Sequence, residues 1–134
     1  MKKKIVAIDF GMKRCGLAIS SETKTMALPW TTVSMDKVAS TLQVRQKEIE
    51  KIIVGLPLLL SGEKGEMATL VESFAKALEK TLEIPVELID ERLSSKHAMS
   101  ILRDTGQSRK KQTEKTDEVT ATLLLDGYLS RISF

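Results

Sequence analysis

The segment from Ile5 to Ser20 constrains the fold of this chain most strongly. It contains two apolar runs, and between them lie an aspartate, two glycines and two cations. The first run is continuous over residues 5–8, which is typical of a strand that is buried on both faces. Because the glycines between the runs favour a tight turn, the segment predicts a hairpin of two strands.

Asp9 directly follows the first run, where a buried carboxylate would be costly without a compensating partner. An acid at the end of a buried strand, beside Gly11 and the cations Lys13 and Arg14, is suited to hold a metal ion and a phosphate. Alternatively, Asp9 accepts hydrogen bonds from its own turn and has a structural role only. This segment alone does not decide between the two interpretations.

The length of 134 residues predicts a single domain, residues 1–134, with one core. The net charge is +3, and the segment from Arg103 to Lys115 has five cations against two acids. We expect that segment to be a loop. Its charge permits a nucleic-acid partner without demonstrating one.

The single cysteine, Cys15, cannot form an internal disulfide, which fits a reducing compartment. We expect it to be a small apolar residue of the second strand. No apolar run approaches the roughly 20 residues of a membrane span, and Asp9 interrupts the only apolar run near the N-terminus. We therefore expect a cytoplasmic protein that does not contact a membrane.

Beyond the hairpin, the apolar pattern predicts alternating strands and helices. Strands are expected over 28–33, 51–56 and 86–91, and helices over 35–50, 66–82, 94–102 and from Thr116 to 129. The first three strands would be antiparallel, and helical crossovers would make the last two parallel to their neighbours. The sequence thus predicts an α/β fold with a five-stranded mixed sheet flanked by helices.

Acidic residues end two of the predicted strands, at Asp9 and at Asp90–Glu91. In parallel parts of a sheet, ligands gather at the carboxyl ends of the strands. Asp117 near the start of the last helix is a third candidate, although Glu118 competes with it and the helical period does not choose. The alternative is structural, because acids in a first helical turn interact favourably with the helix dipole.

Three converging carboxylates would raise one another's pKa values, and a divalent metal would remove that conflict. All-oxygen ligands suit Mg²⁺ or Mn²⁺ better than zinc. Two such ions about 4 Å apart would hold a phosphodiester for in-line attack by water. The basic segment before Asp117 would then bind the substrate backbone, so the sequence indicates a metal-dependent nuclease.

Four motifs occur in a fixed order along the chain. They are Ile-Asp-Phe-Gly-Met-Lys-Arg-Cys-Gly-Leu-Ala-Ile-Ser at 8–20, Ile-Val-Gly-Leu-Pro at 53–57 with Gly62 and Gly65 after it, Asp-Glu-Arg-Leu-Ser at 90–94, and Lys-Thr-Asp at 115–117. Together they resemble the YqgF family of pre-16S ribosomal RNA nucleases, also described as Holliday-junction-resolvase-like. The resemblance implies a ribonuclease-H-like fold and maturation of the 5′ end of small-subunit ribosomal RNA, with the assembling small ribosomal subunit as a possible partner.

The resemblance also implies site residues. It places a catalytic, metal-binding triad on Asp9, Glu91 and Asp117, and so favours Asp117 over Glu118. Substrate contacts are expected from the first loop, the acidic-strand motif and the basic segment, at Gly11, Lys13, Arg14, Arg92, Arg109, Lys110, Lys111 and Lys115. The chain departs from the family pattern at Ser21, Ser61 and Thr120, none of which is a triad acid.

Other functions remain open at this stage. The Asp-x-Gly hairpin also resembles the first phosphate loop of actin-like ATPases and sugar kinases, but those enzymes close two large domains around a nucleotide. A DNA junction resolvase would use the same acids in two sites related by a two-fold axis, so monomer and homodimer both stay possible. A non-catalytic RNA-binding or ribosome-assembly module would leave the acids structural. The only histidine, His97, is expected to be a surface residue.

Overall fold

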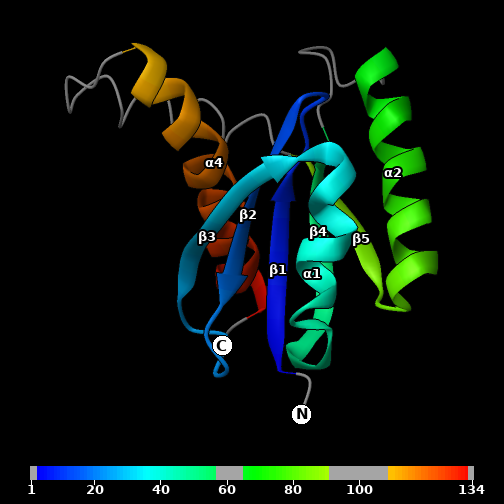
Figure 1. Ribbon diagram of the computed structural model, residues 1–134. Helices are drawn as coiled ribbons and strands as arrows, with labels where there is room; N and C mark the ends of the chain where they lie inside the picture. Colours follow the sequence, from blue (N-terminus) through cyan, green and yellow to red (C-terminus); the bar gives the residue numbers. More distant parts are fainter. Residues whose placement is uncertain (1–2, 57–64, 91–108, 133–134) are drawn as a thin grey trace.

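The computed structural model describes residues 3–56, 65–90 and 109–132, with the backbone alone at 90 and 109–118. Figure 1 shows a central sheet between two layers of helices. The elements in chain order are β1 (Lys4–Asp9), β2 (Arg14–Ser20), β3 (Ala27–Ser34), η1 (Met35–Lys37), α1 (Val38–Gln43), η2 (Gln46–Glu48), β4 (Ile49–Leu56), α2 (Glu66–Leu82), β5 (Val86–Asp90) and α4 (Arg109–Ile132).

The sheet has the strand order β3-β2-β1-β4-β5. β2 is antiparallel to both β1 and β3, whereas β4 is parallel to β1 and β5 is parallel to β4. The prediction of a five-stranded mixed sheet is therefore confirmed. Because β1, β4 and β5 run in the same direction, their carboxyl ends lie at one edge of the sheet, at the top of Figure 1.

Both faces of the sheet are covered, which explains the continuous apolar run of β1. Val6 and Ile8 belong to a core cluster with residues of α1 and α2, and Ile5 and Ala7 belong to a second cluster beneath α4. The residues of α4 in that second cluster are Ala121, Leu124, Leu125, Tyr128 and Leu129. Alternate residues of β1 thus contact different layers, as the period of a strand requires.

Small residues lie where α4 crosses the sheet. Ala7 of β1 is paired with Ala18 of β2, and both are fully buried together with Ala121 of α4. α4 packs mainly against β1, β2 and β3. The small side chains let the helix backbone approach these strands closely. None of the helices in the described ranges is long and apolar enough to cross a bilayer.

The prediction of one helix over 35–50 is wrong. The chain instead forms two 3₁₀ turns, η1 and η2, on either side of the six-residue α1, and Ile49 already begins β4 opposite Lys4. The segment has few apolar residues to bury along a helix, and Val44 just after α1 is 86% exposed. A short polar helix with so little to bury ends early, and the strand begins two residues sooner than predicted.

The last helix begins at Arg109 rather than at Thr116, so the prediction of a basic loop up to residue 115 is also wrong. Residues 109–116 are polar but rich in Lys, Arg, Gln and Glu, which have high helix propensity. The loop prediction relied on the lack of apolar residues in this segment, but a polar segment can also form a helix. Arg109, Lys110, Lys111 and Lys115 therefore lie on the first turns of α4.

The predicted helix over 66–82 is confirmed as α2, although its buried stripe is narrower than predicted. Its buried residues are Ala68, Val71, Ala75, Leu78 and Leu82, while Met67 and Leu70 are 38% and 45% exposed. β3, which contains Pro29, is the outermost strand of the sheet, where a proline that lacks an N–H donor is tolerated. The predicted helix over 94–102 and His97 lie outside the described residues.

Candidate active site

Asp9 is the last residue of β1 and is half-buried at the carboxyl edge of the sheet. By the alternation of β1 it shares the α4 face with Ile5 and Ala7. Gly16 is its partner on β2, and because Ile8 aligns with Val54, the next position on β4 is Gly55. The positions directly opposite Asp9 on both neighbouring strands are therefore glycines, which have no side chain.

Gly11 shapes the turn that follows Asp9. A Cβ at this position would lie 2.3 Å from the carbonyl oxygen of Arg14, so only glycine permits this approach of the two backbones. The Gly11 carbonyl also accepts a weak hydrogen bond from the thiol of Cys15, at 3.6 Å. Cys15 is fully buried in β2, as predicted. The structure thus explains Gly11 by the backbone of the turn, and its contact with substrate stays a prediction.

The two cations of the turn differ in position. Lys13 lies in the turn itself and is exposed, whereas Arg14 begins β2 and is half-exposed. Arg14 shares the α4 face with Gly16 and Ala18, so it is the diagonal neighbour of Asp9 on the adjacent strand. Such positions are about 7–8 Å apart, within reach of a long side chain. The structure therefore brings Arg14, rather than Lys13, onto the face of Asp9.

Asp117 lies in the third turn of α4, not in its first turn. The helix-dipole explanation for this acid is therefore wrong, because that effect falls off within the first turn. β5 ends at Asp90, and Glu91 and Arg92 lie outside the described residues. Among the side chains that the structure describes, no three of His, Cys, Asp or Glu gather into a metal site.

Two surface grooves lie away from this edge. One, of about 240 Å³, runs between α2 and β5 and is lined by Glu72, Ala75, Lys76, Glu79, Val86 and Leu88. The other, of about 120 Å³, lies between α1 and α2 beside Phe74 and Met35. Neither contains a residue that the sequence predicted for the site. The chemistry of the acids therefore points to the carboxyl edge rather than to these grooves.

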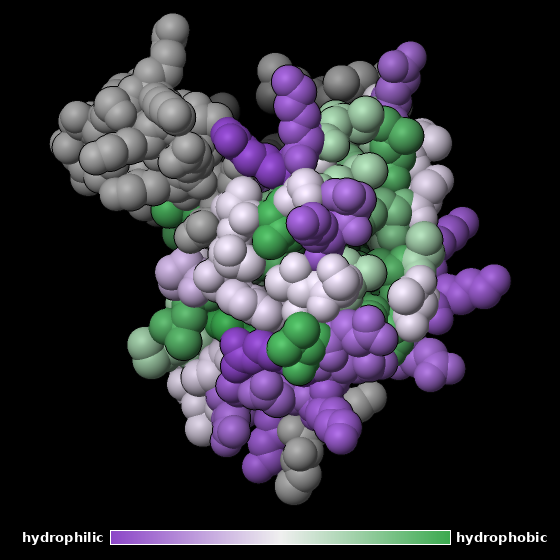
Figure 2. Space-filling model, viewed as in Figure 1, coloured by the Kyte–Doolittle hydropathy of each residue, from purple (hydrophilic) through white to green (hydrophobic). Residues whose placement is uncertain are grey.

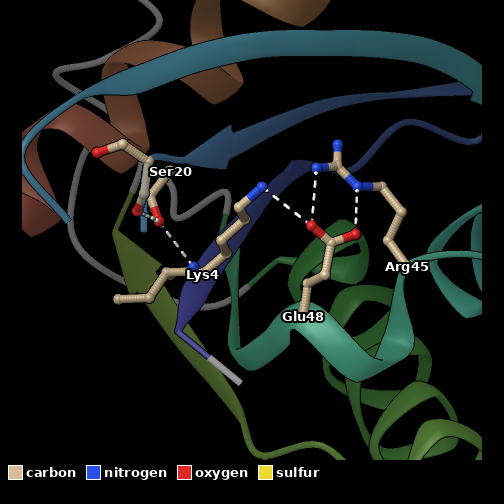
Figure 3. A network of polar contacts seen from close by, with 6 residues as sticks. Lys4, Ser20, Arg45 and Glu48 are labelled. Atoms are coloured by element: carbon tan, nitrogen blue, oxygen red, sulfur yellow. Dashed lines mark hydrogen bonds and ion pairs between the residues drawn. The ribbon is translucent and has the colours of Figure 1, made fainter. Parts of the chain in front are cut away.

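Charged side chains join elements at the opposite end of the sheet. Figure 2 shows hydrophilic residues gathered at the lower end of the molecule, where β1 begins. There the Glu48 carboxylate accepts hydrogen bonds from Arg45, at 3.0 and 3.2 Å, and from Lys4, at 3.0 Å (Figure 3). Arg45 first, and then Lys4, lower the pKa of Glu48 to about 2. Sequence reasoning did not identify this network, whose members come from separate elements.

A second polar group attaches α4 to the sheet near its C-terminal end. The Lys51 ammonium donates to the Tyr128 hydroxyl at 2.6 Å and also to the Glu87 carboxylate. The bond to Glu87, followed by that to Tyr128, raises the pKa of Lys51. Tyr128 is 8% exposed and belongs to the core cluster between α4 and the sheet. These contacts hold α4 against β4 and β5 far from the carboxyl edge.

Known proteins match almost the whole chain. The profile of the family described as "RuvX: Holliday junction resolvase" matches residues 3–131. A relative from Protochlamydia amoebophila, named "Putative pre-16S rRNA nuclease", is 38% identical over 138 residues, 94% of this chain and 92% of its own length. A relative of the same name from Chloroflexus aurantiacus is 37% identical over 130 residues, 93% of this chain and 85% of its own length.

A solved structure matches the fold. Thermus thermophilus RuvC in complex with a Holliday junction substrate superposes with a TM-score of 0.58, covering 96% of this chain and 95% of that chain. The two sequences are only 12% identical, so the likeness bears on the fold alone. RuvC has a ribonuclease-H-like fold, and the ribonuclease-H-like fold expected from the sequence is therefore confirmed.

Proposed function

The chain belongs to the family described as "RuvX: Holliday junction resolvase", and on that premise we propose that it is a metal-dependent endonuclease. It would hydrolyse phosphodiester bonds in nucleic acid, with the 5′ region of precursor 16S ribosomal RNA as the preferred substrate. The observation that carries the proposal is the position of Asp9. Asp9 ends β1, the central strand of the sheet, between two glycine positions and on the face covered by the helix that contains Asp117.

The proposed triad is Asp9, Glu91 and Asp117. Asp9 ends β1 and Asp117 lies in α4, both within the described residues. Glu91 follows β5 in the chain and is included because of the family resemblance.

The choice of Asp117 over Glu118 is supported by the rotation of α4. The buried arc of this helix is formed by Thr120, Ala121, Leu124, Leu125, Tyr128 and Leu129. With about 100° of rotation per residue, position 117 falls about 30° from the centre of that arc, and position 118 about 70°. Position 117 is therefore the better placed of the two to face the sheet.

Mg²⁺ or Mn²⁺ fits the proposed donors. The three proposed ligands are all carboxylates, whose oxygen donors suit these ions, and Asp9 is half-buried at the carboxyl edge of the sheet. When bound, two such ions would supply a nucleophilic water and stabilise the leaving oxygen. Asp9, Glu91 and Asp117 would hold them at the carboxyl edge.

Cations on two elements would bind the substrate backbone. Arg14 lies on the face of Asp9, and Lys110 is seven residues before Asp117, on the same side of α4. Phosphate contacts of this kind position a nucleic acid without reading its sequence. Arg92, Lys13, Arg109, Lys111 and Lys115 complete the proposed set of basic contacts.

The test uses two substrates, a precursor 16S ribosomal RNA fragment and a four-way DNA junction. Each is incubated with the protein in Mg²⁺, in Mn²⁺ and in chelator. We expect metal-dependent cleavage of the RNA that the Asp9→Asn variant loses, while the control Asp36→Asn, at an exposed acid of η1, retains it. Cleavage by Asp9→Asn at the wild-type rate would overturn the proposed site.

Junction cleavage is the second candidate function, favoured by the family description and by the RuvC fold. A junction resolvase needs two sites related by a two-fold axis. If a protein that sediments as a dimer cleaves the junction but not the RNA, the substrate is DNA and the proposed catalytic acids remain the same. Binding of RNA without cleavage in any metal would instead favour a non-catalytic ribosome-assembly module.

A further inference from the structure

Arg14 and Ser34 lie side by side on neighbouring strands. Arg14 begins β2, Ser34 ends β3, and the two are partners in the antiparallel register. The next pair in that register, Cys15 with Val33, packs against the α1–α2 cluster, so Arg14 and Ser34 lie on the α4 face. Directly opposite residues have Cβ atoms about 4.5–5.5 Å apart. A guanidinium and a hydroxyl, both half-exposed, therefore occupy one small area.

The backbone around Ser34 leaves its hydroxyl without a capping role. Ser34 precedes the 3₁₀ turn η1 with an extended conformation, at φ −66° and ψ 152°, yet its side chain forms no capping hydrogen bond. Serine at the start of a helical turn commonly accepts a hydrogen bond from the turn's N–H groups. Its position in the strand register, beside Arg14, gives this serine a different possible partner.

Both residues lie at the end of the sheet where Asp9 lies. Asp9 is paired with Gly16, and Arg14 is the next residue of β2 on that face. Ser34 is one strand further, so its Cα lies about 12 Å from that of Asp9 by the spacing of strands and residues in a sheet. The three positions form a diagonal from β1 across β2 to β3.

We propose that Arg14 and Ser34 form a phosphate-binding subsite for the nucleic-acid strand on the β3 side of Asp9. This inference rests on the proposed nuclease function and adds the direction in which the substrate leaves the cleavage site. Arg14 would bind two oxygens of one phosphate through its guanidinium, and Ser34 would donate its hydroxyl to the same group. The contact is sequence-independent and can serve RNA and DNA alike.

The first experiment measures binding of short RNA and DNA oligonucleotides in chelator, where no cleavage occurs. We expect Ser34→Ala and Arg14→Gln each to weaken binding about tenfold, as for a hydrogen bond to a charged group. The double variant should lose less than the product of the two effects, because both side chains hold one phosphate. Ser34→Thr keeps the hydroxyl and should bind like the wild type.

Two control variants match these changes. Ser40→Ala removes an exposed hydroxyl in α1, and Arg131→Gln removes an exposed cation near the end of α4. Both should bind normally, and unfolding temperatures should show that all variants are folded. Wild-type affinity in Ser34→Ala would overturn the subsite, as would equal losses in Arg14→Gln and Arg131→Gln.

The second experiment replaces one phosphate at a time by an uncharged methylphosphonate. The wild type should lose affinity at one phosphate within a few nucleotides of the cleaved bond, and Ser34→Ala should lose that sensitivity. If the wild type cleaves RNA but the wild type and Ser34→Ala lose affinity at the same phosphates, the proposed subsite is wrong and the proposed nuclease function stands. If the profile changes as expected but no metal supports cleavage, the nuclease is wrong and the subsite stands. A wild type that binds neither polymer refutes both.

Discussion

At the scale of the residue, the surroundings of Asp9 combine two kinds of constraint. Gly16 and Gly55, both buried, are the positions opposite Asp9 on the neighbouring strands, and Gly11 lets the turn close against the carbonyl of Arg14. Gly16 and Gly55 determine which atoms can lie next to Asp9, whereas Gly11 determines whether β2 can begin at Arg14. Substitutions at these glycines should therefore separate site chemistry from turn geometry.

Gly11→Ala should destabilise the protein, because the added Cβ would lie 2.3 Å from backbone that cannot rotate away. We expect a loss of about 1–3 kcal/mol in the free energy of unfolding, measured by urea denaturation. Gly127→Ala is the matched control, since a Cβ there has nothing within 4 Å and lies in the middle of α4. It should raise stability by up to about 1 kcal/mol. Equal effects of the two variants would contradict this account of the turn.

Glu48 predicts a pH dependence. Its folded-state pKa is lowered from 4.5 to about 2 by Arg45 and Lys4, so the folded protein binds its proton less readily than the unfolded chain. The stabilisation is present above pH 4.5 and is lost as the pH falls towards 2. Unfolding temperatures should therefore fall less steeply with acid in Glu48→Gln than in the wild type or in Glu22→Gln.

Because Glu48 is exposed, this effect should shrink at high salt, where surface charges are screened. If the unfolding temperatures of the wild type and of Glu48→Gln fall equally steeply with acid at low salt, the network does not lower the pKa of Glu48.

At the scale of the element, α4 contains a buried polar group that its packing does not satisfy. Thr120 is 1% exposed, and among the described residues its Oγ1 has no hydrogen-bond partner. Buried hydroxyls without partners are costly. Thr120 is also one of the positions at which this chain departs from the family pattern named in the sequence analysis.

Thr120→Val should therefore stabilise the protein by about 1 kcal/mol, because valine keeps the shape of threonine and removes the hydroxyl. Thr122→Val, at a half-exposed position of the same helix, should give no such gain. Urea denaturation of the two variants and the wild type checks this. A loss of stability in Thr120→Val would mean that the hydroxyl has a partner when the protein is in solution.

Elements with a strong apolar period could be predicted from the sequence, and polar ones could not. β1 and α2 were recognised because burial dictates their pattern, with α2 correct at both ends. The start of α4 was missed because Arg109–Lys115 are helix formers without an apolar face. The helix over 35–50 was overestimated because its sparse apolar residues were read as one stripe.

The site shows the same limit. The position of Asp9 at the end of β1 could be predicted, since an acid that follows a continuous apolar run is visible in the sequence. The neighbours of Arg14 could not be predicted from the sequence, because they depend on the register between β2 and β3. That register shifts between Leu17 and Ala18, which changes every pairing beyond it by one residue. Ser34 was therefore not recognised as a partner of Arg14.

At the scale of the whole molecule, the two ends of the sheet have different roles. Polar networks around Glu48 and around Lys51 tie loops and α4 to the end where β1 begins. The carboxyl ends of β1, β4 and β5 meet at the other end, where Asp9 ends β1 (Figure 1). In this arrangement, side chains at the carboxyl edge can be substituted while the polar networks at the opposite end continue to stabilise the fold.

The rate at which Asp9→Asn cleaves precursor 16S ribosomal RNA in Mg²⁺ decides whether this carboxylate belongs to the catalytic site. We expect the rate to fall at least about a hundredfold relative to the wild type, with unchanged unfolding temperature, because the carboxylate would hold the metal. The control Asp36→Asn should cleave at the wild-type rate. A folded Asp9→Asn protein that cleaves as fast as the wild type would show that the catalytic site lies elsewhere.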